Sequence, residues 1–245
     1  ADKVYDATVN AVLSGSASLH TSITGGTGIG SDGKPYTGDT VSLSGTAVAN
    51  FNDKDVDDAT TVSFSGLSLS GADTENYSLT THADSSHSIT PKALTVSGLS
   101  SADKVYDATV SAAVMGTASL QTSIIGGAGS DSDGKPYTGD TVSLSGTAVA
   151  NFDDKDVADA TTVSFSGLSL SGAEAGNYSL TTHADSSHSI TPKALTISGL
   201  SSADKVYDAT ISAVLSGSAS LQTLITGGTG TDSDGKPYTG DTVSL

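Results

Sequence analysis

The chain has 245 residues, a formal net charge of −17 at pH 7, and neither cysteine nor tryptophan. Such an acidic surface repels nucleic acid and anionic membranes, because binding phosphates requires clustered Lys or Arg. No apolar run approaches the ~20 residues that a membrane helix needs. Without cysteine, each folded domain must be held together by its core rather than by disulfides.

The sequence repeats in a register of 101 residues: Ala-Asp-Lys-Val-Tyr-Asp-Ala-Thr begins at Ala1, Ala102 and Ala203. We call residues 1–101, 102–202 and 203–245 copies 1, 2 and 3. Copies 1 and 2 differ at only sixteen positions, without insertions. Near-identical copies cannot divide a catalytic reaction between them, whereas a tandem array adds length or valency. Copy 3 stops within a stretch that continues in the other two, so we expect the protein to extend beyond both ends.

Alternating apolar and polar residues predict short β-strands along each copy. In copy 1 the runs are Tyr5–Leu13, Val41–Phe51, Val62–Leu69, Tyr77–Leu79 and Ala93–Val96. A change of parity at Gly66 predicts a β-bulge. No segment of ten residues or more keeps a 3.6 period, so we expect no helix longer than about two turns. Short strands with frequent turns favour two packed sheets per copy.

Two Pro-Lys pairs mark the expected domain junctions, because Pro91 and Pro192 cannot donate a hydrogen bond within a sheet. Residues 1–91 then form a β domain without its first strand, residues 92–192 a complete domain, and residues 193–245 the N-terminal half of a third. Almost no linker separates these domains, so neighbours should abut. The predicted fold class is all-β: tandem Ig-like β-sandwich domains that form an extended rod.

Several blocks of the sequence together resemble one known family. In order along the chain they are Lys-Ala-Leu-Thr-Val-Ser-Gly, Asp-Lys-Val-Tyr-Asp-Ala-Thr, Gly-Asp-Thr-Val-Ser-Leu-Ser-Gly, Phe-Asn-Asp-Lys-Asp-Val and Asn-Tyr-Ser-Leu. This pattern is similar to the YDG repeat of large bacterial surface adhesins and haemagglutinin-like exoproteins. The resemblance implies an all-β stalk module that holds a distal adhesive domain away from the cell, and it offers no catalytic residue.

The chain departs from the family pattern at the glycine of the Tyr-Asp-Gly motif for which the family is named. Ala7, Ala108 and Ala209 stand where glycine is expected. Because alanine adopts positive φ reluctantly, this change weakens the prediction of a positive-φ turn at these positions.

Clustered acids make calcium the strongest candidate ligand. Asp53, Asp55, Asp57 and Asp58 lie in one predicted turn, and carboxylate oxygens suit Ca²⁺. The equivalent turn of copy 2 carries Asp153 and Asp156 but has Ala158 in place of the third acid. We take Asp53, Asp55, Asp153 and Asp156 as the candidate ligands. The alternative is a solvated turn capped by its own Asp side chains, and we expect this alternative to hold.

One loop contains the ingredients of a catalytic site, His82-Ala-Asp84-Ser85-Ser-His87, and copy 2 repeats it from His183 to His188. In an extended stretch, positions five apart point to opposite faces, so both imidazoles could not reach one metal ion. A hydrolase triad would also need a nucleophile elbow and a third member placed by the fold. We therefore expect an exposed polar loop and no enzyme.

Tyrosines supply most of the aromatic side chains. Tyr5 and Tyr77 lie in alternating runs and are predicted to be core residues, whereas Tyr36 lies in a turn and could be exposed. In the alternative interpretation, exposed tyrosines stack on sugars and the array multiplies a weak affinity.

The sequence as a whole predicts a structural spacer of a secreted or surface-attached bacterial adhesin, in an extracellular setting. Its expected partners are neighbouring repeats of the same chain, and other stalks or cell-surface glycans are candidate partners, with no nucleic acid and no membrane insertion. The first alternative is that the repeats themselves bind cell-surface glycans or neighbouring stalks. No cofactor is expected apart from the candidate Ca²⁺.

Overall fold

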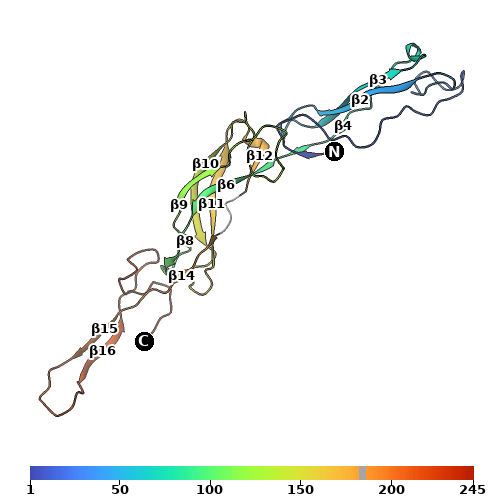
Figure 1. Ribbon diagram of the computed structural model, residues 1–245. Coiled ribbons are helices and arrows are strands. Elements are labelled where there is room, and N and C mark those ends of the chain that lie inside the picture. Colours follow the sequence, from blue (N-terminus) through green and yellow to red (C-terminus); the bar gives the residue numbers. More distant parts are fainter. Residues whose placement is uncertain (182–185) are drawn as a thin grey trace. The chain divides into compact units, whose positions relative to one another are not determined.

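The computed structural model describes residues 1–181 and 186–245, and its regular structure is almost entirely β (Figure 1). Within these residues the only helical elements are two short 3-10 helices, η1 (Thr74–Asn76) and η2 (Ala175–Asn177). No helix in the described part of the chain is long and apolar enough to cross a membrane. The prediction of an all-β fold is confirmed.

The chain forms two compact units, each made of three segments. Unit 1 comprises Ala1–Thr95, Leu120–Ser145 and Ser169–Thr181. Unit 2 comprises Val96–Ser119, Gly146–Leu168 and Thr182–Leu245, of which residues 186–245 are described in the last segment. Unit 1 therefore contains residues of copies 1 and 2, and unit 2 contains residues 96–101 of copy 1 together with residues of copies 2 and 3.

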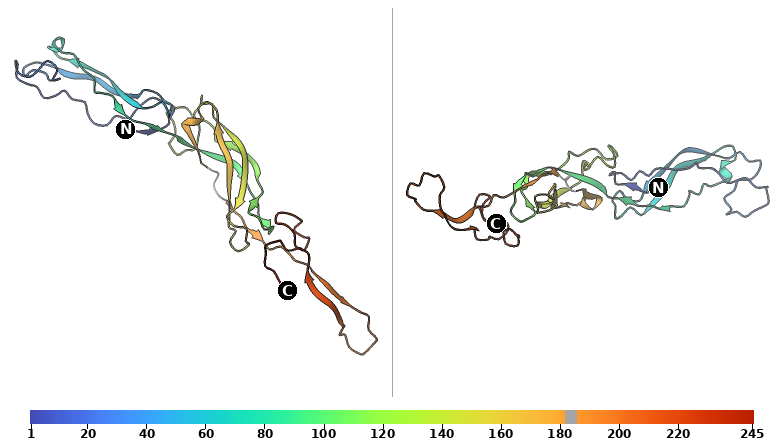
Figure 2. Two further views of the ribbon diagram at one scale, coloured as in Figure 1. Left: turned by 180° about the vertical axis from the view of Figure 1, so that it is seen from behind. Right: turned by 90° about the horizontal axis from the view of Figure 1, so that it is seen from below.

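A long antiparallel pair dominates the copy 1 part of unit 1. Strand β2 (Ser42–Phe51) pairs with β3 (Thr61–Ser70), which in turn pairs with β4 (Ser85–Ser86). Figure 2 shows the β2–β3 pair from two further sides. The register shifts opposite Gly66, where a Cβ would lie 2.2 Å from the Thr46 carbonyl oxygen. The predicted bulge at Gly66 is confirmed, and only glycine fits there at φ 83°.

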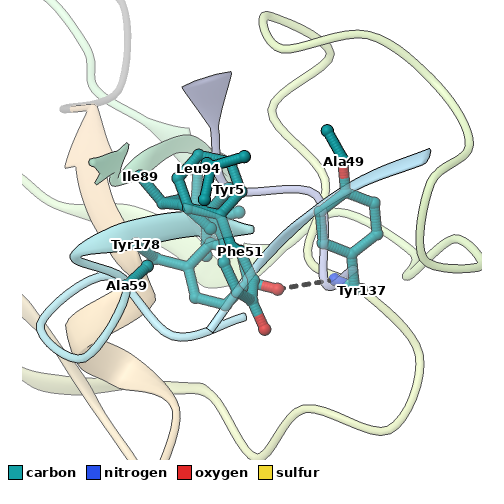
Figure 3. Close-up of a cluster of buried hydrophobic side chains, with 9 residues drawn as sticks. Tyr5, Ala49, Phe51, Ala59, Ile89, Leu94, Tyr137 and Tyr178 are labelled. Atoms are coloured by element: carbon teal, nitrogen blue, oxygen red, sulfur yellow. Dashed lines mark hydrogen bonds between the residues drawn. The ribbon is translucent and has the colours of Figure 1, made fainter. Parts of the chain in front are cut away.

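Two parallel pairs complete unit 1. Strand β1 (Lys3–Val4) pairs with β5 (Ile89–Thr90), and the first four residues of β6 (Lys92–Ser100) pair with β12 (Tyr178–Thr181). The core between them is shown in Figure 3. Its buried members come from both copies: Tyr5, Ala49, Phe51, Ala59, Val62, Ile89, Leu94, Tyr137 and Tyr178.

The strands of copy 2 repeat two of these pairings, the parallel pair next to the tyrosine at the start of the copy and the long antiparallel pair with its short third strand. Strand β7 (Lys104–Val105) runs parallel to β14 (Ile190–Thr191), as β1 does to β5. One sheet has the order β13-β11-β10-β8, and the second half of β6 lies beside β9. These strands are β8 (Ser111–Ala112), β9 (Met115–Leu120), β10 (Ser143–Phe152), β11 (Thr162–Ser171) and β13 (Ser186–Ser187). In copy 3, β15 (Ile197–Ser202) pairs with β16 (Leu215–Leu221).

The predicted strand over Tyr5–Leu13 is wrong for most of its length. The chain leaves β1 at Val4 and turns at Ala7, where φ is 61°, and Asn10 forms only an isolated bridge to Asn50. The same positive φ occurs at Ala108 and Ala209. The expectation that alanine at these positions argues against a positive-φ turn is therefore also wrong. Side chains, rather than a glycine, hold this turn.

Candidate interface between successive copies

A half-buried lysine, Lys3, holds together the turn that follows β1, which we call the tyrosine turn (residues 3–10). The Lys3 ammonium donates to the Asp6 carboxylate at 2.6 Å and to the carbonyl oxygens of Thr8 and Asn10 at 2.7 and 2.9 Å. The same Asp6 oxygen accepts the Thr8 backbone N–H at 2.9 Å. Together these bonds fix the backbone around Ala7 in the left-handed region, at a steric cost of about 1–2 kcal/mol. Lys104 and Lys205 make the equivalent bonds in copies 2 and 3.

The tyrosine turn of copy 1 presents Tyr5 to residues of copy 2. Its side chain is fully buried, and its ring contacts those of Tyr137 and Tyr178 edge-on, with centroids 5.9 and 5.3 Å away. The Tyr5 hydroxyl donates a 2.9 Å hydrogen bond to Asp140, and the Tyr178 hydroxyl donates to the same carboxylate. Burial, and then the neighbouring Asp140 charge, raise the pKa of both Tyr5 and Tyr178 above the ordinary tyrosine value.

Backbone groups add to this contact. The Tyr178 hydroxyl accepts the Tyr137 N–H at 2.9 Å, the bond drawn in Figure 3. The Gly127 N–H of copy 2 donates to the Asp6 carbonyl of copy 1 at 2.7 Å. A Cβ on the adjacent Gly126 would lie 3.2 Å from the Ala7 Cβ, so the two backbones approach closely. The contact therefore uses backbone shape as well as side chains.

Asn177 forms a second bridge from copy 2 to copy 1. Its side-chain oxygen accepts the Val56 N–H at 2.8 Å, and its amide nitrogen donates to Asp55 at 2.7 Å. Lys54 donates to the same Asp55 oxygen. Burial acts to raise the pKa of Asp55, but the bonds from Lys54 and Asn177 outweigh it and lower the pKa. Asp55 is thus part of the interface.

Lys92 anchors the beginning of β6. Its side chain is fully buried, with the ammonium 2.9 Å from Asp133, 3.1 Å from the Tyr137 hydroxyl and 4.2 Å from the centroid of the Tyr137 ring. A buried ammonium is stable only when it is paired in this way. Lys193 repeats the arrangement with Asp234 at 2.9 Å and Tyr238 at 3.0 Å. Hydrogen bonds from Lys193 and from two backbone N–H groups lower the pKa of Asp234 to about 2.

Unit 2 contains the second interface of the same kind, between copies 2 and 3. Tyr106 donates to Asp241 at 2.9 Å, its ring contacts that of Tyr238 at 5.8 Å, and Gly228 donates to the Asp107 carbonyl at 2.7 Å. A cavity of about 450 Å³ lies here, lined by residues that include Tyr106, Lys193 and Asp241.

The first tyrosines of the three copies differ in burial. Tyr5 is 0% exposed, Tyr106 is half-buried, and Tyr207 is 90% exposed. The predicted core role of Tyr5 is confirmed, and its core is shared with the next copy.

Tyr77 is half-buried while its counterpart Tyr178 is buried. Tyr36 is exposed, as the turn suggested, but its counterparts Tyr137 and Tyr238 are both buried.

The acidic turns use their carboxylates for internal hydrogen bonds. Asp53 accepts the Asp55 N–H at 2.9 Å, and in copy 2 Asp156 pairs with Lys155 at 2.6 Å. Asp153 accepts the N–H groups of Thr161 and Thr162 at 2.9 and 3.0 Å, and these bonds lower its pKa. Among the described residues, no three His, Cys, Asp or Glu side chains gather in a way that could hold a metal ion.

The histidines of the candidate catalytic loop have separate partners. The His82 ring contacts Phe64 edge-on at 5.1 Å, and its Nδ1 lies 2.8 Å from the Ala83 carbonyl oxygen. His87 lies 3.1 Å from Asp2, and His188 lies 3.2 Å from Asp103. His183 lies outside the described residues.

Sequence reasoning missed Asp140, Asn177 and Lys92 as interface residues. The signal available was their presence at equivalent positions of the copies, as Asp39 and Asp241, Asn76, and Lys193. That signal is weak, because most positions are shared by the copies.

In a comparison with protein families, residues 1–85 and 90–186 match the YDG domain. No curated protein and no solved structure matches the chain.

Proposed function

Because the chain belongs to the YDG domain family, we propose that it is a structural spacer, a run of stalk repeats from a secreted or surface-attached bacterial adhesin. In this role the repeats project a distal binding domain away from the cell surface during adhesion or biofilm formation. The partners of each repeat are then its neighbours along the chain.

The repeated interface carries this proposal. Tyr5 of copy 1 is buried in a core to which copy 2 contributes Tyr137 and Tyr178, and the Tyr5–Asp140 bond recurs as Tyr106–Asp241. One face of each copy binds a different face of the next, and such head-to-tail contacts generate open chains when they do not close into a ring. A chain that grows by one fixed contact is suited to setting a distance, which is the task of a spacer.

In the finer form of the proposal, each domain is an Ig-like sandwich and the array is an extended rod. A strand of ~11 residues at ~3.3 Å per residue suggests a rise of about 35–40 Å per domain. Support comes from the antiparallel strand pairs and from the absence of flexible linker sequence at Pro91-Lys92 and Pro192-Lys193.

Small-angle scattering of arrays with two, three and four copies tests the spacer directly. We expect the maximum dimension to increase by the same increment with each added copy. A compact, folded-back particle, or an increment that shrinks with length, would contradict the proposal.

The alternative is that the repeats bind glycans or neighbouring stalks themselves. Exposed Tyr36 is the feature that favours it, although burial of Tyr137 and Tyr238 removes the same ring from the surface in the other copies. A glycan array probed with the full chain distinguishes the two functions, because a spacer gives no selective signal. The proposal assigns no catalysis, and changing His82 and His183 together should alter no hydrolytic activity.

A further inference from the structure

Residues from the beginning and from the end of copy 2 lie side by side. Strand β7 runs parallel to β14, with Lys104 opposite Ile190. The Tyr106 N–H donates to the Thr191 carbonyl oxygen at 2.8 Å, and the Lys104 N–H donates to the Ser189 carbonyl oxygen at 3.2 Å. We call these two segments, residues 103–106 and 188–191, the terminal pair of copy 2.

Side chains strengthen the terminal pair beyond its two short strands. The Asp103 carboxylate accepts the Ser189 N–H at 2.9 Å and lies 3.2 Å from a ring nitrogen of His188. The Thr191 hydroxyl donates to the carbonyl oxygen of Lys104 at 3.3 Å. Ile190 is 2% exposed, so the backbone bonds around it lie in a low-dielectric environment, where hydrogen bonds are stronger than in water.

Copy 1 has the same terminal pair, formed by residues 2–5 and 87–90. The Tyr5 N–H donates to the Thr90 carbonyl oxygen at 2.8 Å, and the Asp2 carboxylate accepts the Ser88 N–H at 3.0 Å. Ile89 is buried like Ile190. Each terminal pair is thus complete within its own copy.

The parallel direction of the two strands determines how the pair responds to tension along the chain. Tension enters copy 2 ahead of Asp103 and leaves it through Pro192, so it pulls β7 toward its N-terminal end and β14 toward its C-terminal end. In parallel strands these two directions are opposite, and the strands are sheared along their length. All the bonds of the pair then carry the load together. In antiparallel strands the same tension would act at one end and break the bonds one after another.

We propose that the terminal pair is a mechanical clamp through which each copy bears tension along the chain. This function goes beyond that of a spacer, which sets a distance whether or not it is under load. Sliding of β7 also requires the Lys104 ammonium to leave the carbonyl oxygens of Thr109 and Ser111, at 2.7 and 2.9 Å. Ser111 belongs to β8, which pairs with β10, so the clamp is tied to a larger sheet.

Strand β6 is loaded in the same way. It precedes β7 in the chain, and its first four residues run parallel to β12, which precedes β14. Tension that enters through Pro91 therefore shears this pair as well. Lys92, the first residue of β6, is held by its buried ion pair with Asp133 at 2.9 Å. Both pairs of parallel strands between residues 92 and 191 thus resist tension in shear.

Force spectroscopy on the full chain with cysteine handles tests the clamp, since the chain has no cysteine of its own. Ala102→Cys with Pro192→Cys places the handles at opposite ends of the terminal pair and shears it. The matched control, Ala102→Cys with Ser189→Cys, places both handles at the same end and unzips the same pair. At equal pulling speed the force of rupture should be about twofold higher in shear, because forced unfolding reports the barrier in the direction of pulling.

The two handle pairs enclose nearly the same length of chain, so a release of about 300 Å identifies the same event in both. Equal forces of rupture in the two directions would overturn the proposal.

An aspartate variant tests whether the rupture occurs at the terminal pair. Asp103→Ala removes the bonds to Ser189 and His188 and should lower the shear force between handles at positions 102 and 192. Asp2→Ala makes the same change in copy 1, outside these handles, and should leave that force unchanged. In urea both variants should lose similar stability, because they remove equivalent bonds. An equal loss of force from both variants, or no loss from Asp103→Ala, would overturn the proposal.

Handles at the two ends of the chain, Ala1→Cys and Leu245→Cys, leave both terminal pairs unaltered and load them in series. The force–extension trace should then show two ruptures above the unzipping force, each releasing about 300 Å. Copies that unravel at or below the unzipping force would show that the terminal pairs bear no load.

Discussion

The hydroxyl of Tyr5 and the carboxylate of Asp140 are joined by a 2.9 Å hydrogen bond although they lie in different copies of the repeat. Tyr106 and Asp241 form the same bond, also at 2.9 Å, with the same separation in sequence. The first tyrosine of copy 1 therefore lies in a core that copy 2 completes, and the stability of copy 1 depends in part on copy 2.

Replacing Tyr5 by Phe should destabilise unit 1 by about 1.5–3 kcal/mol, the typical value of a hydrogen bond to a charged group. Tyr207→Phe is the matched control, because Tyr207 stands in the same local sequence but is 90% exposed. It should change the free energy of unfolding by less than about 0.5 kcal/mol. Urea unfolding followed by circular dichroism measures both, and equal effects would contradict the interface.

The same bond determines a pH dependence. The pKa of Tyr5 and of Tyr178 is raised in the folded chain, first by burial and then by Asp140, so the unfolded chain loses these protons first. Their contribution to stability is complete below about pH 10, the ordinary tyrosine pKa, and declines as pH rises beyond it. Tyr5→Phe should make the decline between pH 10 and pH 11 shallower.

Replacing Ala7 by glycine should stabilise the chain by up to about 1 kcal/mol, because glycine adopts φ near 61° without the steric cost that alanine carries. Ala49→Gly is the control: Ala49 is buried in β2, and losing its methyl group should destabilise. Thermal unfolding of the two variants should shift in opposite directions. A lower melting temperature for Ala7→Gly would mean that the Ala7 methyl contact at Gly126 matters more than backbone strain.

Removing the carboxylate of Asp133 should lower the free energy of unfolding strongly. The Lys92 ammonium would stay buried with only the Tyr137 hydroxyl and ring as partners. Copy 1 supplies the control. Asp32 accepts the same turn N–H groups, from Ile29 and Lys34, but pairs with no lysine among the described residues. Asp133→Ala should therefore destabilise by about 3 kcal/mol more than Asp32→Ala. Similar losses in the two variants would mean that the turn bonds, and not the buried pair, dominate.

Calcium should stabilise the chain no more than monovalent salt at matched ionic strength. Asp53 and Asp153 are engaged with backbone N–H groups of their own turns, and Asp55 with Lys54 and Asn177. Screening of a charge of −17 then explains any effect of salt. A saturable, calcium-selective rise in melting temperature that disappears in Asp53→Ala with Asp55→Ala would contradict this expectation.

Alternation was sufficient to locate the long strands, because burial of one face leaves a local pattern. The runs Val41–Phe51 and Val62–Leu69 correspond closely to β2 and β3, and the change of parity at Gly66 marks the bulge. The run Tyr5–Leu13 also alternates, but it forms a turn and not the predicted strand. Hydrogen bonds of the Lys3 and Asp6 side chains hold this turn and compete with strand pairing.

The interface could not be predicted in the same way. Alternation shows that Tyr5 is buried but not what buries it, and Asp140 lies far along the chain in a loop that resembles any other acidic turn. Acidic residues look the same in sequence whether they bind an ion, cap a turn or accept a tyrosine hydroxyl. Only the fold distinguishes Asp140 from Asp53.

Chemical footprinting of Tyr207 tests most directly the claim that each copy buries the first tyrosine of the copy before it. In the present chain Tyr207 is 90% exposed and should react as fast as free tyrosine, while Tyr5, at 0% exposure, should be protected. Extending the sequence in the same register by one and a half further copies supplies Tyr207 with counterparts of Tyr137, Asp140 and Tyr178. Mass spectrometry should then find Tyr207 protected to the level of Tyr5. A Tyr207 that stays fully reactive in the extended chain would contradict the account.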